Sequence, residues 1–194
     1  MRARQRKDSQ RISPKPFLIL CEGEKTEPSY VKILKKWYPN NKLECPIVKD
    51  KHNNPHQLIN KMNKIAESYA DNTVLVIICD KDSRSDQEIQ KLIDWKKEDH
   101  DKRIAIINDP CFEYWLSLHF QDNHPKISVQ GFTALIKEFL PHYNKEIMPN
   151  DIKDTHIKDA LKRAKSRNNQ LQREENKYPH TNMPEFIEAL KSDN

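Results

Sequence analysis

The chain has 194 residues, of which 36% are hydrophobic and 32% charged, enough for one α/β domain with a substantial core. Only Gly23 and Gly131 are glycine, which excludes a glycine-rich phosphate-binding loop of the P-loop or dinucleotide type. The net charge of +5 equals that of residues 1–16, which hold six Lys or Arg and one Asp. The longest apolar run, Val74–Cys79, is too short to cross a membrane.

Residues 1–16 read as a basic, flexible arm. Its positive side chains, with Arg4, Arg6 and Lys7 at the centre, suit the phosphate backbone of a nucleic acid. A solubilising tail without a partner explains the same composition, and the sequence leaves both open. The apolar run Phe17–Leu20 after the arm is too short for a signal peptide, and the four cysteines are widely spaced without a C-x-x-C pair. We therefore expect reduced thiols and a cytoplasmic location.

Two strand–helix pairs are predicted in the first third of the chain. Phe17–Cys21 is an apolar run of strand length. Pro28 then opens a helix, as proline does in a first turn, and apolar residues continue it at helical spacing: Tyr30, Val31, Leu34 and Trp37. Leu43–Val48 predicts a strand at a sheet edge, because a proline interrupts it. Over Pro55–Tyr69 the apolar residues recur with helical period.

The next part of the chain repeats this alternation. Thr73–Cys79 is the strongest strand pattern, apolar on both faces as in the centre of a covered parallel sheet. Ser85 and Glu88 have the spacing of a capping box, which starts a helix. Arg103–Ile107 predicts a fourth strand, and Cys111–Phe120 a short helix with apolar residues almost all round.

These elements predict an α/β fold, with a mainly parallel β-sheet sandwiched by helices over residues 17–125. After Gln121 we expect no further strand. Residues 126–194 are predicted to form a C-terminal helical region that packs on the core or extends it. Its helical patterns are Phe132–Leu140, Ile152–Lys165 and Pro184–Leu190.

Acidic residues follow three of the predicted strands. The carboxyl ends of parallel strands meet at one rim of a sheet, where ligands bind, so these side chains should converge. Hard divalent cations such as Mg²⁺ prefer carboxylate oxygens, and such an ion supports phosphodiester hydrolysis by activating water. The sequence thus predicts a site for Mg²⁺ or Mn²⁺. The acids in these loops are Glu22, Glu24, Glu27, Asp80, Asp82, Asp109 and Glu113.

Most of these acids also have a simpler explanation. Asp80 and Asp82 could cap a helix or lie at the surface. Glu27 and Glu113 could each complement the dipole of a helix N-terminus, and Glu24 is expected to face solvent. Glu22 is the strongest single candidate, since it directly follows a buried strand and precedes one of only two glycines.

The order of these motifs resembles a known family. A strand ending in Glu-Gly and a later strand ending in Asp-x-Asp resemble the Toprim domain of topoisomerases, bacterial primases and the overcoming-lysogenization-defect nucleases. The segments C-E-G-E-K-T-E-P-S-Y, C-D-K-D and N-D-P-C-F-E-Y-W-L-S-L-H-F together resemble the RloB family over about residues 17–120. The resemblance implies a Toprim-like fold and a Mg²⁺- or Mn²⁺-dependent nuclease in bacterial defence against phage. It also implies a partner ATPase encoded alongside.

The resemblance assigns roles by position. Glu22 matches the Toprim glutamate, a metal ligand or general acid/base, and Asp80 with Asp82 matches the metal-binding pair. Glu27 matches the second acid of a Glu-Gly-x-Thr-Glu motif, although this loop has one extra residue. Glu113 belongs to the family signature and is a candidate to complete the metal shell.

The third motif departs from the family pattern. Asp109 separates Asn108 from Pro110, where the family joins Asn and Pro directly. His119 shares a helical face with apolar residues, which predicts a buried histidine of the core.

Two functions are thus open. The first is a metal-dependent nuclease that cleaves DNA or RNA, transfer RNA included. The alternative is a non-catalytic nucleic-acid-binding or sensor subunit that works with a partner ATPase. Lys162, Arg163 and Lys165 on a predicted helix could contact phosphates or form a solvated face. A homo-oligomer is compatible with the sequence.

Overall fold

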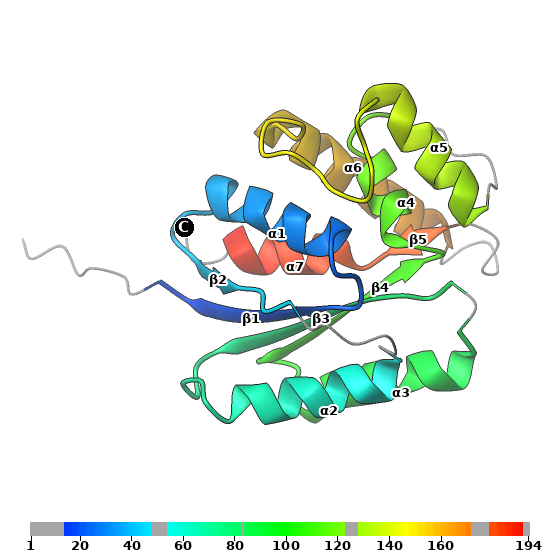
Figure 1. Cartoon of the computed structure of the whole chain (residues 1–194). Helices are drawn as coiled ribbons and strands as arrows, with labels where there is room; N and C mark the ends of the chain where they lie inside the picture. The colour runs from blue at the N-terminus through cyan, green and yellow to red at the C-terminus, as the bar shows by residue number, and fades with distance from the viewer. Residues whose placement is uncertain (1–13, 48–53, 83, 123–127, 172–178, 192–194) are drawn as a thin grey trace, which may run out of the picture.

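A parallel sheet with helices on both faces forms the protein (Figure 1). The computed structural model describes residues 14–47, 54–82, 84–122, 128–171 and 179–191. The strands in these ranges lie in the order β2-β1-β3-β4-β5, and β5 alone among them pairs antiparallel. The strands are β1 (Pro16–Cys21), β2 (Lys42–Glu44), β3 (Val74–Asp80), β4 (Arg103–Asp109) and β5 (His180–Thr181). The predicted fold class, a mainly parallel α/β sheet with a C-terminal helical extension, is confirmed.

Helices cover the two faces of the sheet unequally. α2 and α3 lie on one face, and α1 with α4 to α7 lies on the other (Figure 1). The helices are α1 (Thr26–Trp37), α2 (Pro55–Ala66), α3 (Asp86–Glu98), α4 (Phe112–Ser117), α5 (Val129–Phe139), α6 (Asp154–Leu171) and α7 (Met183–Lys191). The predicted capping box at Ser85 is confirmed, because its side chain accepts from the N–H of Glu88, whose carboxylate accepts from the N–H of Ser85.

The central strand β3 packs against helices on both faces. Val76 and Ile78 belong to the core beneath α1, while Ile77 and Cys79 belong to the core above α2 and α3. Such alternation buries both sides of the strand, which explains its unbroken apolar sequence.

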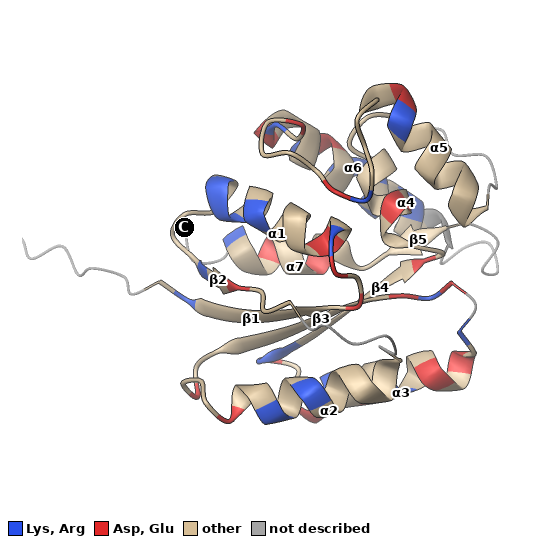
Figure 2. Cartoon of the chain, in the orientation of Figure 1, with Lys and Arg blue, Asp and Glu red and all other residues tan. Residues whose placement is uncertain are grey.

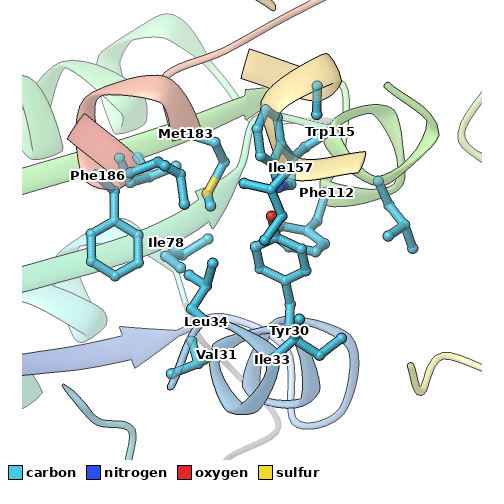
Figure 3. Close-up of a cluster of buried hydrophobic side chains, with 14 of the residues drawn as sticks. Tyr30, Val31, Ile33, Leu34, Ile78, Phe112, Trp115, Ile157, Met183 and Phe186 are labelled. Atoms are coloured by element: carbon cyan, nitrogen blue, oxygen red, sulfur yellow. The ribbon is translucent and has the colours of Figure 1, made fainter. Parts of the chain in front are cut away.

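The C-terminal helices contribute to the larger of these two cores. Tyr30 from α1, Trp115 from α4, Ile157 from α6 and Phe186 from α7 belong to one buried cluster (Figure 3). The helices after residue 126 therefore pack directly on the sheet domain, and the interior of the protein is continuous between them.

The structure adds one strand that the sequence did not predict. β5 is two residues long, too short to show any periodicity, and pairs with the end of β4. The Thr181 hydroxyl donates to the Asn108 side chain at 2.6 Å, and the Asn182 N–H donates to the Ile107 carbonyl at 3.2 Å. Tertiary contacts, not local propensity, thus place this strand.

Several element boundaries differ from the predictions by a few residues. α1 begins at Thr26, two residues before its proline, so that Glu27 lies in the first helical turn. α4 ends at Ser117, and β2 ends at Glu44, two residues before the proline of its segment. The candidate nucleic-acid contacts Arg4, Arg6 and Lys7 lie outside the described residues.

Candidate functional site

An acidic cavity of about 450 Å³ opens where β1 and β3 end. Its lining contains five carboxylates and two lysines, so negative charge dominates. Most of these groups come from the loop after β1, the end of β3 and the first turn of α4. The lining residues are Glu22, Gly23, Glu24, Lys25, Thr26, Glu27, Asp80, Phe112, Glu113 and Lys145.

Glu22 bridges the ends of the two central strands. Its backbone N–H continues the ladder of β1 by donating to the Ile78 carbonyl at 3.0 Å. Its Oε2 accepts from the Asp80 N–H at 3.0 Å and from the Cys79 thiol at 3.1 Å, and its Oε1 pairs with the guanidinium of Arg84. The side chain, 26% exposed, is therefore held at the mouth of the cavity.

Glu27 turns back from the first turn of α1 toward Gly23. Its Oε1 accepts from the Gly23 N–H at 3.1 Å. A Cβ atom built on Gly23 would lie 2.8 Å from that oxygen, so this close approach requires glycine. Burial raises the pKa of Glu27 to about 7, and the nearby charges of Glu113 and Glu22 add to the increase.

Asp80 is half-buried at the end of β3. Burial raises the pKa of Asp80 well above its usual value, with further increases from Glu27, Glu22 and Glu113. Its Oδ1 accepts a 3.4 Å hydrogen bond from Asn108, whose own side-chain oxygen accepts from β5. Asn108 therefore positions Asp80, a role that the sequence did not reveal.

Glu113 lines the same cavity from the first turn of α4. Its Oε1 accepts a 2.9 Å hydrogen bond from the Tyr143 hydroxyl and pairs with the ammonium group of Lys145. Burial would raise the pKa of Glu113, but the hydrogen bond and charge of Lys145 lower it below its usual value. Lys145 has a φ of 61°, uncommon for a residue with a side chain. Neither Tyr143 nor Lys145 belongs to a motif, so the sequence offered no signal for them.

The two acids of the Asp-x-Asp motif lie apart. Asp80 lines the cavity, whereas Asp82 is exposed and does not line it. β3 ends at Asp80, and the chain turns at Asp82, which has a φ of 33° and donates its N–H to the Pro110 carbonyl. The structure brings together Glu22, Glu27, Asp80 and Glu113, but not Asp82.

The donor chemistry of the cavity suits a hard divalent cation. Within the described ranges, neither Glu27 nor Asp80 forms an ion pair with a lysine or arginine, so their proximity leaves negative charge uncompensated. Mg²⁺ or Mn²⁺ coordinated by these oxygens would offset it. Among those same residues, however, no three His, Cys, Asp or Glu side chains form a ready-made metal centre. Glu22 and Glu113 instead engage Arg84 and Lys145.

The basic residues predicted on α6 contact the protein itself. Arg163 donates to the Leu118 carbonyl at 2.7 Å, and Lys165 pairs with Glu188 at 2.9 Å, while Lys162 is exposed. Two of the three predicted phosphate contacts thus have partners within the fold.

His119 is a buried core residue, as its helical position predicted. Its Nε2 shares a 2.9 Å hydrogen bond with the Tyr30 hydroxyl, and its Nδ1 lies 3.1 Å from the Trp115 carbonyl. Burial lowers the pKa of His119 to about 3, so it is neutral at pH 7.

A second cavity, of about 550 Å³, lies on the α3 side of the sheet beside β4 and β5. Its charged groups are paired. Lys81 lies 3.3 Å from Asp109 and 3.5 Å from Asp86, and His180 lies 3.7 Å from Asp109. The remaining ammonium group in its lining, that of Lys96, pairs with Glu185 at 2.6 Å.

Comparisons with known proteins agree with the motifs. A family model described as RloB-like protein matches residues 17–190. No curated protein and no solved structure matches the chain. In the described part of the chain, no helix has the length and apolar character needed to cross a membrane.

Proposed function

The chain belongs to the RloB-like family, and from this premise we propose that it is a metal-dependent nuclease of bacterial anti-phage defence. Its substrate class is nucleic acid, DNA or RNA. The observation that carries the proposal is a pair of carboxyl groups with raised pKa values, that of the buried Glu27 and that of the half-buried Asp80, in a cavity that they share with Glu22 and Glu113. Burying acids together without compensation is costly, and proteins commonly keep such arrangements at functional sites.

The contacts of each acidic side chain in the cavity suggest its role in metal binding. Asp80 and Glu27 would hold the cation, with Glu22 as a further oxygen donor from the mouth of the cavity. Glu113, kept ionised by Lys145, lines the same cavity. Bound Mg²⁺ or Mn²⁺ would supply charge neutralisation at a phosphate and a water of lowered pKa.

The basic side chains at the cavity orient the acids and attract the substrate. Arg84 orients Glu22, and Lys145 orients Glu113, in each case through an ion pair. Lys25 and Lys145 line the cavity and provide positive charge for the oxygens of a phosphodiester. The acids thus hold the cation, while the lysines favour entry of an anionic substrate.

A metal titration and a cleavage assay test this function together. Labelled single-stranded DNA, duplex DNA and transfer RNA are incubated with the protein in Mg²⁺, Mn²⁺ or EDTA. We expect cleavage that needs the metal and is lost in Glu22→Gln. Glu67→Gln, which removes an exposed carboxylate just after α2, is the matched control and should retain it. Cleavage that persists in EDTA or in Glu22→Gln would contradict the proposal.

A second function is favoured by the pairing of Glu22 with Arg84 and of Glu113 with Lys145. In a nucleic-acid-binding or sensor subunit that works with a partner ATPase, these ion pairs would close the acidic cavity permanently. Calorimetry with Mn²⁺ separates the two candidates. A nuclease binds the ion and releases protons from its buried carboxyl groups, whereas the non-catalytic subunit binds nucleic acid and no Mn²⁺.

A further inference from the structure

The exposed face of α1 carries positive charge alone. Lys32, Lys35 and Lys36 are exposed, whereas the helix buries its apolar face against the sheet. The one acid in α1 is Glu27, and it is buried in the acidic cavity. In Figure 2 the blue bands of lysine lie toward the end of α1 remote from that cavity.

This positive face begins at the cavity. Lys25 immediately precedes α1 and lines the cavity, and Lys32 and Lys36 follow it after seven and eleven residues. Such spacings place side chains along one side of a helix. With a rise of 1.5 Å per residue, the four lysines extend over roughly 16 Å. We call Lys25, Lys32, Lys35 and Lys36 the lysine track.

On α3 and α6, unlike on the exposed face of α1, lysines share the surface with acids, and several of them are paired. On α6, Lys158 pairs with Asp154 at 2.5 Å, and Lys165 pairs with Glu188. On α3, Lys96 pairs with Glu185 and Lys97 with Asp94. Among the described residues, by contrast, no carboxylate forms an ion pair with a member of the lysine track.

Neighbouring contacts hold one end of the track in place without neutralising it. The Lys36 Nζ donates to the Asn150 side chain at 3.3 Å and lies 5.1 Å from the centroid of the Trp37 ring. The Trp37 indole N–H in turn donates to the Ile152 carbonyl at 3.3 Å. All these partners are uncharged, so the ammonium group remains available to an anion.

We propose that the lysine track binds the sugar-phosphate backbone of the nucleic-acid strand that the acidic cavity acts on. Rows of lysines attract phosphates regardless of base sequence, and one strand places a phosphate about every 3.4 Å along the helix axis. The track is therefore long enough for about four or five phosphates. It leads the strand into the cavity at Lys25. The inference rests on the proposed function, and it gives that function a direction of substrate entry.

The test measures binding separately from cleavage. Fluorescence anisotropy is recorded with labelled single-stranded DNA and RNA of one sequence, in EDTA, between 50 and 200 mM salt (roughly the range over which phosphate contacts lose affinity). The test variant is Lys32→Gln/Lys35→Gln/Lys36→Gln. The matched control is Lys64→Gln/Lys91→Gln/Lys97→Gln, which removes equal charge from exposed positions on α2 and α3, across the sheet. Residues 1–16 are unchanged in every protein.

We expect the test variant to bind at least about ten-fold more weakly, and its salt slope to fall by about 2, because each lost phosphate contact on a single strand contributes about 0.7. The control should remain within about two-fold of the wild type. DNA and RNA share the phosphate backbone, so both probes should respond, and the one held more tightly by the wild type identifies the preferred strand.

Equal losses in both triple variants would overturn the inference, because net charge alone would then account for binding. An unchanged test variant, or a wild type that does not bind at 50 mM salt, would overturn it as well. Neither result bears on metal-dependent cleavage by the cavity, which is measured independently. Conversely, a chain that binds through the track and never cleaves would retain the track as a binding surface for nucleic acid and refute the nuclease.

Discussion

Two cavities flank the ends of β3 and β4, and they differ in how their charges are balanced. In the acidic cavity, five carboxylates face two lysines, and Glu27 and Asp80 have raised pKa values. In the second cavity, Lys81 lies between Asp86 and Asp109, and each lining acid has a basic neighbour within 4 Å. A position at the carboxyl end of a parallel strand is common to both. Uncompensated charge distinguishes the candidate site.

The same strands supply both cavities, because successive side chains point to opposite faces. Asp80 lines the acidic cavity, and Lys81 lines the second. Likewise, Asn108 contacts Asp80, whereas Asp109 lines the second cavity. The additional acid in the Asn-Asp-Pro segment is thus on the other face of the sheet, and Asn108 keeps its place beside the site.

The largest expected effect is on cleavage. Asp80→Asn preserves the shape of the side chain but removes its charge, and we expect nuclease activity to fall at least about 1,000-fold, equivalent to about 4 kcal/mol. Asp109→Asn, the same change one strand away in the second cavity, should remain within a few-fold of the wild type. The cleavage rates of the two variants and the wild type are compared on one labelled substrate in Mn²⁺. Comparable losses in both variants would erase the distinction between the cavities.

The next effect is on stability against pH. Burial raises the pKa of Glu27 from 4.5 to about 7, so between these values the folded chain keeps a proton that the unfolded chain has lost. The free energy of unfolding therefore decreases as pH rises through this window, by about 3 kcal/mol from Glu27. The Glu27→Gln variant has no carboxyl group at this position, so its free energy of unfolding should not decrease for this reason. Urea unfolding in EDTA should therefore show the variant gaining stability relative to the wild type, by about 3 kcal/mol, as the pH rises from 4.5 to about 7.

His119 provides an internal check on that measurement. Its pKa is lowered to about 3, so the unfolded chain binds the extra proton and stability increases as pH rises from about 3 toward 6.5. This contribution is common to the wild type and Glu27→Gln, and it cancels in their difference. A difference that does not change with pH would mean that Glu27 is ionised throughout.

A slightly smaller effect is expected from the cation. At about 100 times its dissociation constant, Mn²⁺ should stabilise the chain by about 2.7 kcal/mol, which raises the Tm by about 5–10 °C for a protein of this size. Thermal unfolding with and without Mn²⁺ measures it. Asp80→Asn should abolish the increase and Asp109→Asn should not. An equal increase in all three proteins would locate the ion elsewhere.

The smallest effects come from single lysines. Lys145→Gln leaves the carboxylate of Glu113, 4% exposed, without its cation, and should cost about 2 kcal/mol of unfolding free energy. Lys81→Gln breaks two partly exposed ion pairs in the second cavity and should cost less than about 1 kcal/mol. Chemical unfolding at pH 7 compares them. A larger loss for Lys81→Gln than for Lys145→Gln would show that the ion pairs of the second cavity contribute more to stability than the pair in the acidic cavity.

The amino-acid sequence was sufficient to predict the central strands and the convergence of their acids. β1, β3 and β4 are continuous apolar runs, and α3 has its capping box in the expected place. Because each apolar run stops at a polar residue, the sequence also indicates where each strand ends. The positions of Glu22 and Asp80 beside one another therefore follow from local pattern and the rule for parallel sheets.

Tertiary structure alone decided the surroundings of those acids. β5, Tyr143 and Lys145 come from segments without periodicity or motif, yet they position Asp80 through Asn108 and hold Glu113 ionised. The tertiary structure also places Asp82 outside the cavity. Sequence determines which groups can bind a metal or a phosphate, because chemistry belongs to side chains. Burial and pairing are set by distant parts of the chain, and they decide which of these groups carry uncompensated charge.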